Sequence, residues 1–174
     1  FLPETYHYTR GMSDLDLLRR ALLAMDKALA EAWDGRLDDL PLETPDQLLT
    51  LASIIEKETG KASERPEIAG VFVRRLKMGM RLQTDPTVIY GMGSAYDGNI
   101  RRSDLTTDTP YNTYTRAGLP PTPIAMPGMA SLLAAAQPQK TNAIYFVARG
   151  DGSSQFSATL EEHNAAVRRY ILNR

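Results

Sequence analysis

The first third of the chain carries apolar residues at the three- and four-residue spacing of an amphipathic helix. They are Leu15, Leu18, Leu22, Met25, Leu29 and Ala32. Ser13 precedes them and Asp16 follows it three residues later, which is the arrangement of a capping box. Gly35 stands just beyond Trp33, where a helix would end. The pattern therefore predicts one helix from Ser13 to about Trp33 with an apolar stripe along one side.

Two more helices are predicted in the next stretch. Thr44 and Pro45 give a helix start, with Gln47 at the third helical position. This helix carries Leu48, Leu49, Leu51, Ala52, Ile54 and Ile55, and Gly60 is its expected end. A third helix should begin within 63–66 and run to Gly79; its apolar residues are Ile68, Val71, Phe72 and Leu76.

Residues 80–128 change character, because Pro and Gly become frequent and the helical period disappears. Tyrosines and branched apolar residues are interleaved there, which disfavours disorder, so we expect an ordered wall of loops and short strands. A short helix should follow over 128–137, then a hairpin of 144–148 and 155–159, then a helix from Leu160 towards Leu172. Helices followed by loops and a small sheet indicate an α+β fold, and the length of the chain indicates a single domain over 1–174.

Composition narrows the function classes. The chain has 174 residues, with 20 Lys and Arg against 21 Asp and Glu and a net charge of −1. This balance, without a basic run, removes the electrostatic footprint expected of a nucleic-acid binder. The absence of Cys excludes thiolate metal sites and a cysteine nucleophile, and two His are too few for most imidazole-rich sites. We therefore expect neither a metal nor a cofactor. Because the chain begins at Phe1, we interpret it as a piece of a longer protein.

A carboxyl group at the edge of an apolar helical stripe is the first candidate for catalysis. The stripe of the second helix centres between Leu51 and Ile55; Glu58 lies on its edge, whereas Glu56 lies nearer the polar flank. Apolar surroundings disfavour the charged form and raise the pKa, so such a carboxyl group can act as a general acid near neutral pH. The alternative is that Glu58 is an ordinary helix-end residue paired with a neighbouring Lys or Arg.

Residues 81–85 are the second candidate. Arg81, Gln83 and Asp85 alternate, so an extended chain would turn all three to one face. An arginine, an amide and a carboxylate together suit a polyhydroxylated or N-acetylated ligand. A simple turn at Asp85, with Arg81 as its ion-pair partner, explains the same residues equally well.

Tyr111, Asn112 and Tyr114 are the third candidate, beside the Pro-rich loop 118–124. Aromatic rings that stack on sugars and amides that bond to hydroxyls are typical of a carbohydrate groove. The alternative is a packed loop whose Tyr hydroxyls bond to the backbone. His163 fits helix-start packing better than a catalytic role, and no serine lies in a nucleophile motif.

Three long segments match one family in their order along the chain. They are LASIIEKETGKASERPEIAGVFVRRLKMGMRLQTDPTVIYGMG, YNTYTRAGLPPTPIAMPG and IYFVARGDGSSQFSATLEEHN. Together they resemble the YceG-like (MltG-type) endolytic murein transglycosylases, and the resemblance covers nearly the whole chain. It implies a helical, lysozyme-like catalytic core with long Pro/Gly-rich loops and a small sheet. In the lysozyme-like relatives a Glu followed by Ser or Thr ends an apolar helix, and Glu58-Thr59 fits that pattern better than Glu56-Lys57.

The resemblance also implies a reaction and a location. The expected reaction cleaves the β-1,4 bond between N-acetylmuramic acid and N-acetylglucosamine within peptidoglycan strands and leaves 1,6-anhydro ends, with Glu58 as general acid and then base. The residues expected to line the groove are Glu56, Arg81, Gln83, Asp85, Tyr111, Asn112 and Tyr114. Members carry an N-terminal membrane span and a LysM-like portion, so we expect a catalytic domain on the periplasmic side of the inner membrane. Its expected partners are glycan strands and peptidoglycan synthases.

Two other functions fit the same residues. A peptidoglycan hydrolase would use a second carboxylate to activate water or to act as nucleophile, and Asp85 is the candidate for that role beside Glu58. A non-catalytic glycan-binding module of the cell wall would use its carboxylates structurally. The products separate these readings: anhydro ends, reducing ends, or an intact ligand.

Overall fold

Helix α1 (Asp14–Asp34) begins where the sequence predicts. In the computed structural model, which describes residues 1–58 and 60–172, the Ser13 hydroxyl accepts a hydrogen bond from the Asp16 amide at 3.1 Å. The Asp16 carboxylate accepts from the Ser13 amide at 3.2 Å, so both halves of the predicted capping box are present. The helix ends before Gly35, again as the sequence predicts.

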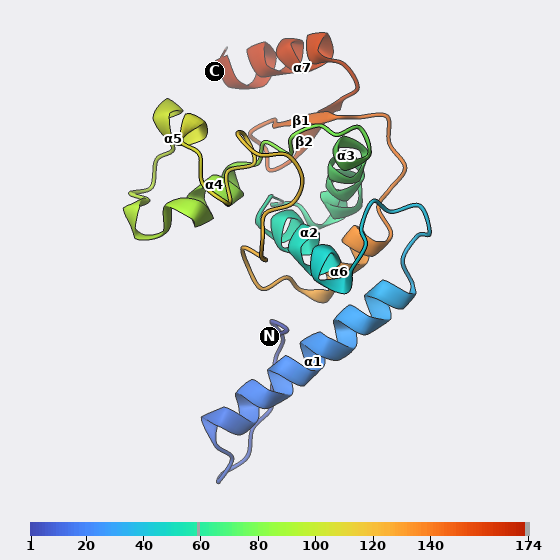
Figure 1. Ribbon diagram of the computed structural model, residues 1–174, viewed down its shortest axis with the longest axis vertical. Helices are drawn as coiled ribbons and strands as arrows, with labels where there is room; N and C mark the ends of the chain where they lie inside the picture. The colour runs from blue at the N-terminus through green and yellow to red at the C-terminus, as the bar shows by residue number, and fades with distance from the viewer. Residues whose placement is uncertain (59, 173–174) are drawn as a thin grey trace.

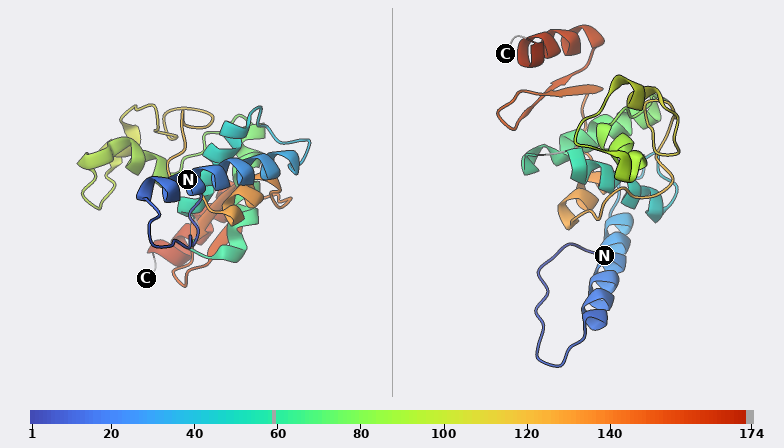
Figure 2. Two further views of the ribbon diagram at one scale, coloured as in Figure 1. Left: turned by 90° about the horizontal axis from the view of Figure 1, so that it is seen from below. Right: turned by 90° about the vertical axis from the view of Figure 1, so that its left-hand side faces the viewer.

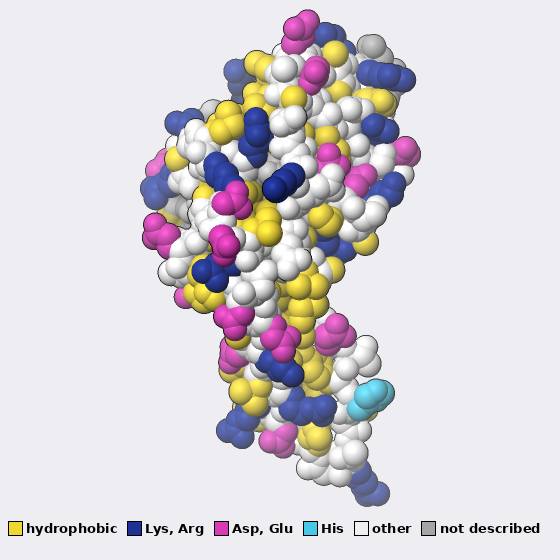
Figure 3. Space-filling model, turned by 90° about the vertical axis from the view of Figure 1, so that its right-hand side faces the viewer, with side chains coloured by type: hydrophobic (Ala, Val, Ile, Leu, Met, Phe, Trp, Pro, Cys, Tyr) yellow, Lys and Arg dark blue, Asp and Glu magenta, His cyan; other side chains and the backbone are white. Residues whose placement is uncertain are grey.

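The second half of α1 packs against the hydrophobic core of the protein. Met25 and Ala32 of the predicted stripe are buried, whereas Leu15, Leu18 and Leu22 are about half exposed. Residues 1–12 run back along the first half of the helix, and the Leu2 amide donates to the Ala21 carbonyl at 2.9 Å. The first half of α1 and this segment form an arm that extends away from the remaining elements (Figure 2). Hydrophobic side chains are visible on its surface (Figure 3).

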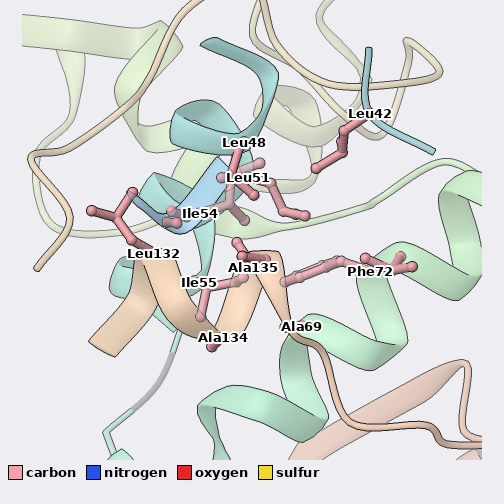
Figure 4. Close-up of a cluster of buried hydrophobic side chains, with 14 of the residues drawn as sticks. Leu42, Leu48, Leu51, Ile54, Ile55, Ala69, Phe72, Leu132, Ala134 and Ala135 are labelled. Atoms are coloured by element: carbon pink, nitrogen blue, oxygen red, sulfur yellow. The ribbon is translucent and has the colours of Figure 1, made fainter. Parts of the chain in front are cut away.

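Helix α2 (Pro45–Glu58) lies at the centre of the core, in contact with α1, α3 (Arg65–Lys77), α4 (Asp85–Met92) and α6 (Met129–Ala136). A short 3-10 helix, η1 (Ala62–Glu64), precedes α3. The predicted helices over these ranges are confirmed. Side chains that are almost completely buried and pack together from α2, α3 and α6 include Leu48, Leu51, Ile54, Ile55, Phe72, Leu132 and Ala135 (Figure 4). Each large one stabilises the fold by about 1.5–3 kcal/mol, so the position of α2 is well determined by packing.

The prediction of short strands within 80–128 is wrong. The structure has three short helices there: α4 (Asp85–Met92), the 3-10 helix η2 (Gly93–Ala95) and α5 (Arg102–Thr106). Pro86 stands at the start of α4, where its fixed φ and missing N–H favour a helix, so Asp85 opens a helix instead of continuing an extended run. Ordered loops join these helices, and Ser53 of α2 holds the last of them by accepting a hydrogen bond from the Ile124 amide at 2.9 Å.

The predicted hairpin is confirmed, with strands β1 (Tyr145–Ala148) and β2 (Ser154–Ser157) paired antiparallel and Phe146 opposite Phe156. It lies between α3 and α7 (Leu160–Val167), and a π-helical turn, η3 (Arg168–Leu172), completes the predicted last helix (Figure 1). The segment before β1 crosses α3 at Gly70, where a Cβ atom would lie 2.2 Å from the Gln139 carbonyl oxygen. Helices with one two-stranded sheet confirm the α+β fold.

Candidate active site

Glu58, the last residue of α2, lies beside a cavity of about 160 Å³. We call this space the Glu58 cavity. Its other lining residues come from α3, the loop before α4, the first residue of α4, the 111–116 turn and β1: Phe72, Arg75, Leu82, Gln83, Asp85, Tyr114 and Phe146. Residues from all three candidates of the sequence analysis therefore share one cavity: Glu58 from the first, Gln83 and Asp85 from the second, and Tyr114 from the third. Thr59, the second half of the Glu-Thr pattern, lies outside the described residues.

The surroundings of Glu58 favour its protonated form. Burial raises the pKa of this carboxyl group most, and the negative charge of Asp85 raises it further. A hydrogen bond from the Thr84 hydroxyl to Oε1 and the positive charge of Arg75 act in the opposite direction, but the net effect is a raised pKa. A carboxyl group that keeps its proton closer to neutral pH is suited to general acid catalysis.

Thr84 belongs to a small buried network of hydroxyl groups behind Glu58. Its amide donates to Thr113 Oγ1 at 3.1 Å, and Thr113 Oγ1 lies 2.9 Å from Thr87 Oγ1. Thr84 stands at the N-cap position of α4, yet its side chain makes no capping bond and donates to Glu58 instead. Sequence reasoning missed this residue. The sequence shows only that Thr84 stands two positions before Pro86, which is typical of an ordinary helix cap. Its contact with Glu58 is visible only in the structure.

Asp85 and Tyr114 form a hydrogen-bonded pair at the cavity. The Tyr114 hydroxyl donates to Asp85 Oδ1 at 2.5 Å, and Arg81 donates to the Tyr114 carbonyl oxygen at 3.0 Å. Burial and the bond to Asp85 raise the pKa of Tyr114, so this hydroxyl keeps its proton and remains a donor. Arg81 therefore supports the turn that carries Tyr114, and it is not an ion-pair partner of Asp85.

Gln83 has a strained backbone. Its φ of +49° is the one positive value at a non-glycine position in the described part of the chain. The left-handed conformation costs about 1–2 kcal/mol at such a position, and a hydrogen bond from the Gln83 amide to the Thr113 carbonyl at 3.2 Å helps to hold it. This conformation breaks the extended run that the sequence predicted for 81–85. The side chain of Gln83 is exposed and lines the Glu58 cavity.

Glu56 lies in a different environment. Its carboxylate accepts hydrogen bonds from the Gly128 amide at 3.1 Å and the Ser131 hydroxyl at 2.6 Å, and Arg65 lies 3.7 Å away. Burial alone would raise the pKa of Glu56, but these two hydrogen bonds and the charge of Arg65 outweigh it and lower the pKa. Glu56 thus caps the start of α6 from α2 as a carboxylate, and it does not line the Glu58 cavity.

Glu56→Ala should therefore destabilise the fold. It leaves the Gly128 amide and the Ser131 hydroxyl without their acceptor, for which we expect a loss of about 1–3 kcal/mol in the free energy of unfolding. Urea denaturation of the variant against the parent chain measures this loss. Lys57→Ala is a matched control, because Lys57 is an exposed neighbour on the same helix. Equal stability of the Glu56 variant and the parent would contradict the capping role.

The raised pKa of Glu58 predicts a specific pH dependence of stability. A carboxyl group whose folded-state pKa is raised binds more protons when folded, so its contribution is fully present below the unfolded pKa and is lost as pH rises through the folded pKa. The urea midpoint of the parent chain should therefore fall, relative to that of Glu58→Gln, as pH rises from the unfolded-state pKa of Glu58 to its folded-state pKa. Parallel pH profiles for the two proteins would contradict the raised pKa.

Tyr111 and Asn112 lie away from the Glu58 cavity lining. The Asn112 amide nitrogen donates to the carbonyls of Asp104, Leu105 and Thr107 at 2.7–3.2 Å, and its oxygen accepts from the Tyr114 amide at 2.8 Å. Asn112 thereby fixes the turn that presents Tyr114. The Tyr111 hydroxyl is 2.7 Å from Thr122 Oγ1, and its ring packs on Tyr90. Their predicted contact with a glycan stays a prediction.

His163 also lies outside the cavity lining, and its ring stacks on Tyr145 with 5.0 Å between ring centroids. The described residues contain no group of three or more His, Cys, Asp or Glu side chains placed to hold a metal ion. None of the helices within the described ranges is long and apolar enough to cross a membrane.

An α+β domain that holds one partly buried acid in a cavity beside a central helix is a candidate acid–base enzyme. The chain belongs to the YceG-like family, whose model matches residues 1–169. It is 40% identical over 169 residues to the endolytic murein transglycosylase of Bacillus subtilis (strain 168), covering 97% of this chain and 46% of that protein. It is 32% identical to the endolytic murein transglycosylase of Streptococcus pneumoniae serotype 2, covering 97% and 31%.

A solved structure has the same fold. The 2.6 Å crystal structure of a YceG-like protein from Listeria monocytogenes is similar with a TM-score of 0.80 at 41% identity, over 94% of this chain and 53% of that one. The chain spans less than half the length of the two curated relatives described above.

Proposed function

We propose that this chain is a single catalytic domain, over 1–174, of an endolytic lytic transglycosylase that acts on peptidoglycan glycan strands. The observation that carries the proposal is Glu58, a partly buried carboxyl group with a raised pKa beside a cavity that Gln83, Asp85 and Tyr114 also line. Kinship with relatives named endolytic murein transglycosylases supplies the substrate class. Both the activity and the substrate of this chain are part of the proposal.

In the first step, protonated Glu58 gives its proton to the oxygen that leaves C1 of N-acetylmuramic acid. The C1–O bond breaks, the N-acetylglucosamine unit leaves with its 4-hydroxyl, and positive charge develops at C1. That charge needs stabilisation, either from the substrate's own N-acetyl group or from polar groups of the protein such as Gln83. The raised pKa of Glu58 is what makes the carboxyl group available as an acid at this step.

In the second step, the Glu58 carboxylate takes the proton of the C6 hydroxyl, and that oxygen bonds to C1. The product is a 1,6-anhydro ring, no water is consumed, and Glu58 is protonated again. One carboxyl group is sufficient for the whole cycle. Thr84 and Arg75 favour the carboxylate form of Glu58, which is the form that this step requires.

A hydrolase is the second candidate, and the observation that favours it is Asp85. This carboxylate shares the cavity with Glu58 and is held by the Tyr114 hydroxyl, so it could orient a water molecule. A non-catalytic glycan-binding module is the third candidate, and it would leave the strands intact.

Mass spectrometry of glycan strands incubated with the chain tests all three. Fragments that end in anhydro-muramic acid, one water lighter than reducing ends, support the transglycosylase. Reducing ends would support the hydrolase and direct attention to Asp85. Intact strands that stay bound would favour the binding module, and the same assay on a longer protein of the family then measures whether the isolated domain lacks a required part.

Location and partners follow from the family resemblance and are part of the proposal. We expect the reaction on the periplasmic side of the inner membrane, with a membrane span outside this chain as anchor, and with peptidoglycan synthases as partners. Fractionation of cells that express the longer protein tests the location, because the catalytic part should then remain with the membrane and be digested by protease added from outside.

A further inference from the structure

Arg75 is a buried cation that bonds to main-chain carbonyls and not to a carboxylate. It is 7% exposed. Its Nε donates to the Ile144 carbonyl at 2.6 Å and its Nη1 to the Leu82 carbonyl at 2.6 Å. The ion pairs formed among the described residues do not include it. Because a buried charge without a paired opposite charge is costly, a purely packing role would be better filled by an apolar side chain.

The two carbonyls that Arg75 binds belong to two different segments, each of which contributes to the lining of the Glu58 cavity. Leu82 precedes the segment that carries Gln83 and Thr84, and Ile144 precedes strand β1, which carries Phe146. Arg75 itself lines the cavity from α3. One side chain therefore holds both segments to the same helix, and through Leu82 it fixes the chain from which Thr84 donates its hydrogen bond to Glu58.

We propose that Arg75 is the positioning residue of this active site, which holds the Gln83–Thr84 segment against Glu58 and supplies the positive charge that stabilises the Glu58 carboxylate after it has given up its proton. This inference rests on the proposed function, in which Glu58 alternates between acid and base. Arg75 acts on Glu58 through its charge and does not form an ion pair with it. The charge of Arg75 therefore favours the carboxylate form of Glu58 but still allows Glu58 to be protonated again.

The other polar groups around Arg75 determine the direction of the expected change. Glu58 of α2, Asp85 of α4 and Tyr114 of the 111–116 turn line the cavity with it. On the other side, the Tyr145 ring of β1 lies 5.3 Å from the guanidinium carbon, and His163 of α7 stacks on that ring. Without the cation, burial and the charge of Asp85 would be opposed only by the Thr84 hydrogen bond, so the pKa of Glu58 would rise.

The test compares Arg75→Lys, which keeps the charge, with Arg75→Gln, which keeps a donor and loses the charge. Arg74→Gln is the matched control, because Arg74 is the exposed neighbour on the same helix. Two properties are measured for each folded variant: kcat and KM on glycan strands as a function of pH, and the NMR titration of the Glu58 carboxyl carbon, assigned by its loss in Glu58→Gln. The titration does not depend on turnover.

We expect kcat to fall about ten- to hundredfold in both Arg75 variants, with a smaller change in KM, because the acid and its supporting segment are displaced. The Glu58 titration and the alkaline limb of kcat/KM should move to higher pH in Arg75→Gln and stay near the parent values in Arg75→Lys and Arg74→Gln. An unchanged Glu58 titration in Arg75→Gln would overturn the proposal. If Arg75→Gln does not fold, Arg75→Lys decides: a parent-like kcat overturns the proposal and a tenfold loss supports it.

Failure of the proposed function gives a different result. If neither the parent chain nor the longer protein cleaves glycan, the reaction assigned to the chain is wrong, but the titration of Glu58 still measures whether Arg75 acts on this carboxyl group. If the Glu58 titration shifts in Arg75→Gln although no glycan is cleaved, the charge of Arg75 acts on the Glu58 carboxyl group, but this effect has no role in catalysis.

Discussion

Glu58→Gln is expected to leave the chain folded and to lower the rate of glycan cleavage by about 10²–10⁴-fold or more, the usual contribution of a general acid–base. The amide has nearly the shape of the carboxyl group, so the cavity is retained, but it has no acidic proton for the leaving oxygen and cannot take the proton of the C6 hydroxyl. The release of anhydro-muramic fragments with time, at equal concentrations of folded protein, measures the loss.

The matched control for this experiment is Glu56→Gln. Glu56 is on the same helix two residues earlier, but it caps α6 and does not line the Glu58 cavity. Wherever this control is folded, we expect it to cleave strands at a rate close to that of the parent chain. Substantial turnover by Glu58→Gln, or failure of that variant to fold, would contradict the assignment of Glu58 as the general acid. A folded but inactive Glu56→Gln would transfer the assignment to Glu56.

The helical part of this fold could be predicted from the sequence because its signals are local. Ser13 with Asp16 is a capping box both in the sequence and in the structure. Periodicity also predicted that Glu58 lies at the edge of the apolar stripe, and its partial burial beside the core follows from that position. The spacing of apolar residues along one helix thus predicted that the pKa of the Glu58 carboxyl group is raised.

The rest of the site depends on contacts between distant segments, and periodicity does not record those. The hydrogen bond from Thr84 to Glu58 spans 26 residues, and the bond from Arg75 to Ile144 spans 69. Asn112 shows the same limit in another form, because an amide that suits a sugar hydroxyl equally suits backbone carbonyls. In the structure the Asn112 side-chain amide donates to backbone carbonyls of the preceding segment. The helices within 80–128 were missed because they are short, and Pro86 was interpreted as part of a turn.

Thr84→Val is expected to lower kcat about ten- to hundredfold, with the fold retained. The Thr84 hydroxyl donates to Oε1 of Glu58, so the acidic proton is carried by the other carboxyl oxygen, Oε2. Valine has almost the same shape but no donor. The carboxyl group would then lose its fixed orientation, and the pKa of Glu58 would rise further because a bond that favours the carboxylate is gone.

Two variants make this test specific. Thr84→Ser keeps the hydroxyl and should retain most of the parent activity. Thr87→Val removes the contact of Thr87 with Thr113 and its hydrogen bond to the Thr84 carbonyl, but it leaves the bond from the Thr84 hydroxyl to Glu58 in place. The pH profile of kcat/KM separates orientation from packing, since only Thr84→Val should move the alkaline limb to higher pH. If Thr84→Val and Thr87→Val lose the same activity with unchanged pH profiles, the hydroxyl network serves packing alone. Glu58 would then be oriented by the walls of its cavity, with Arg75 as their common support.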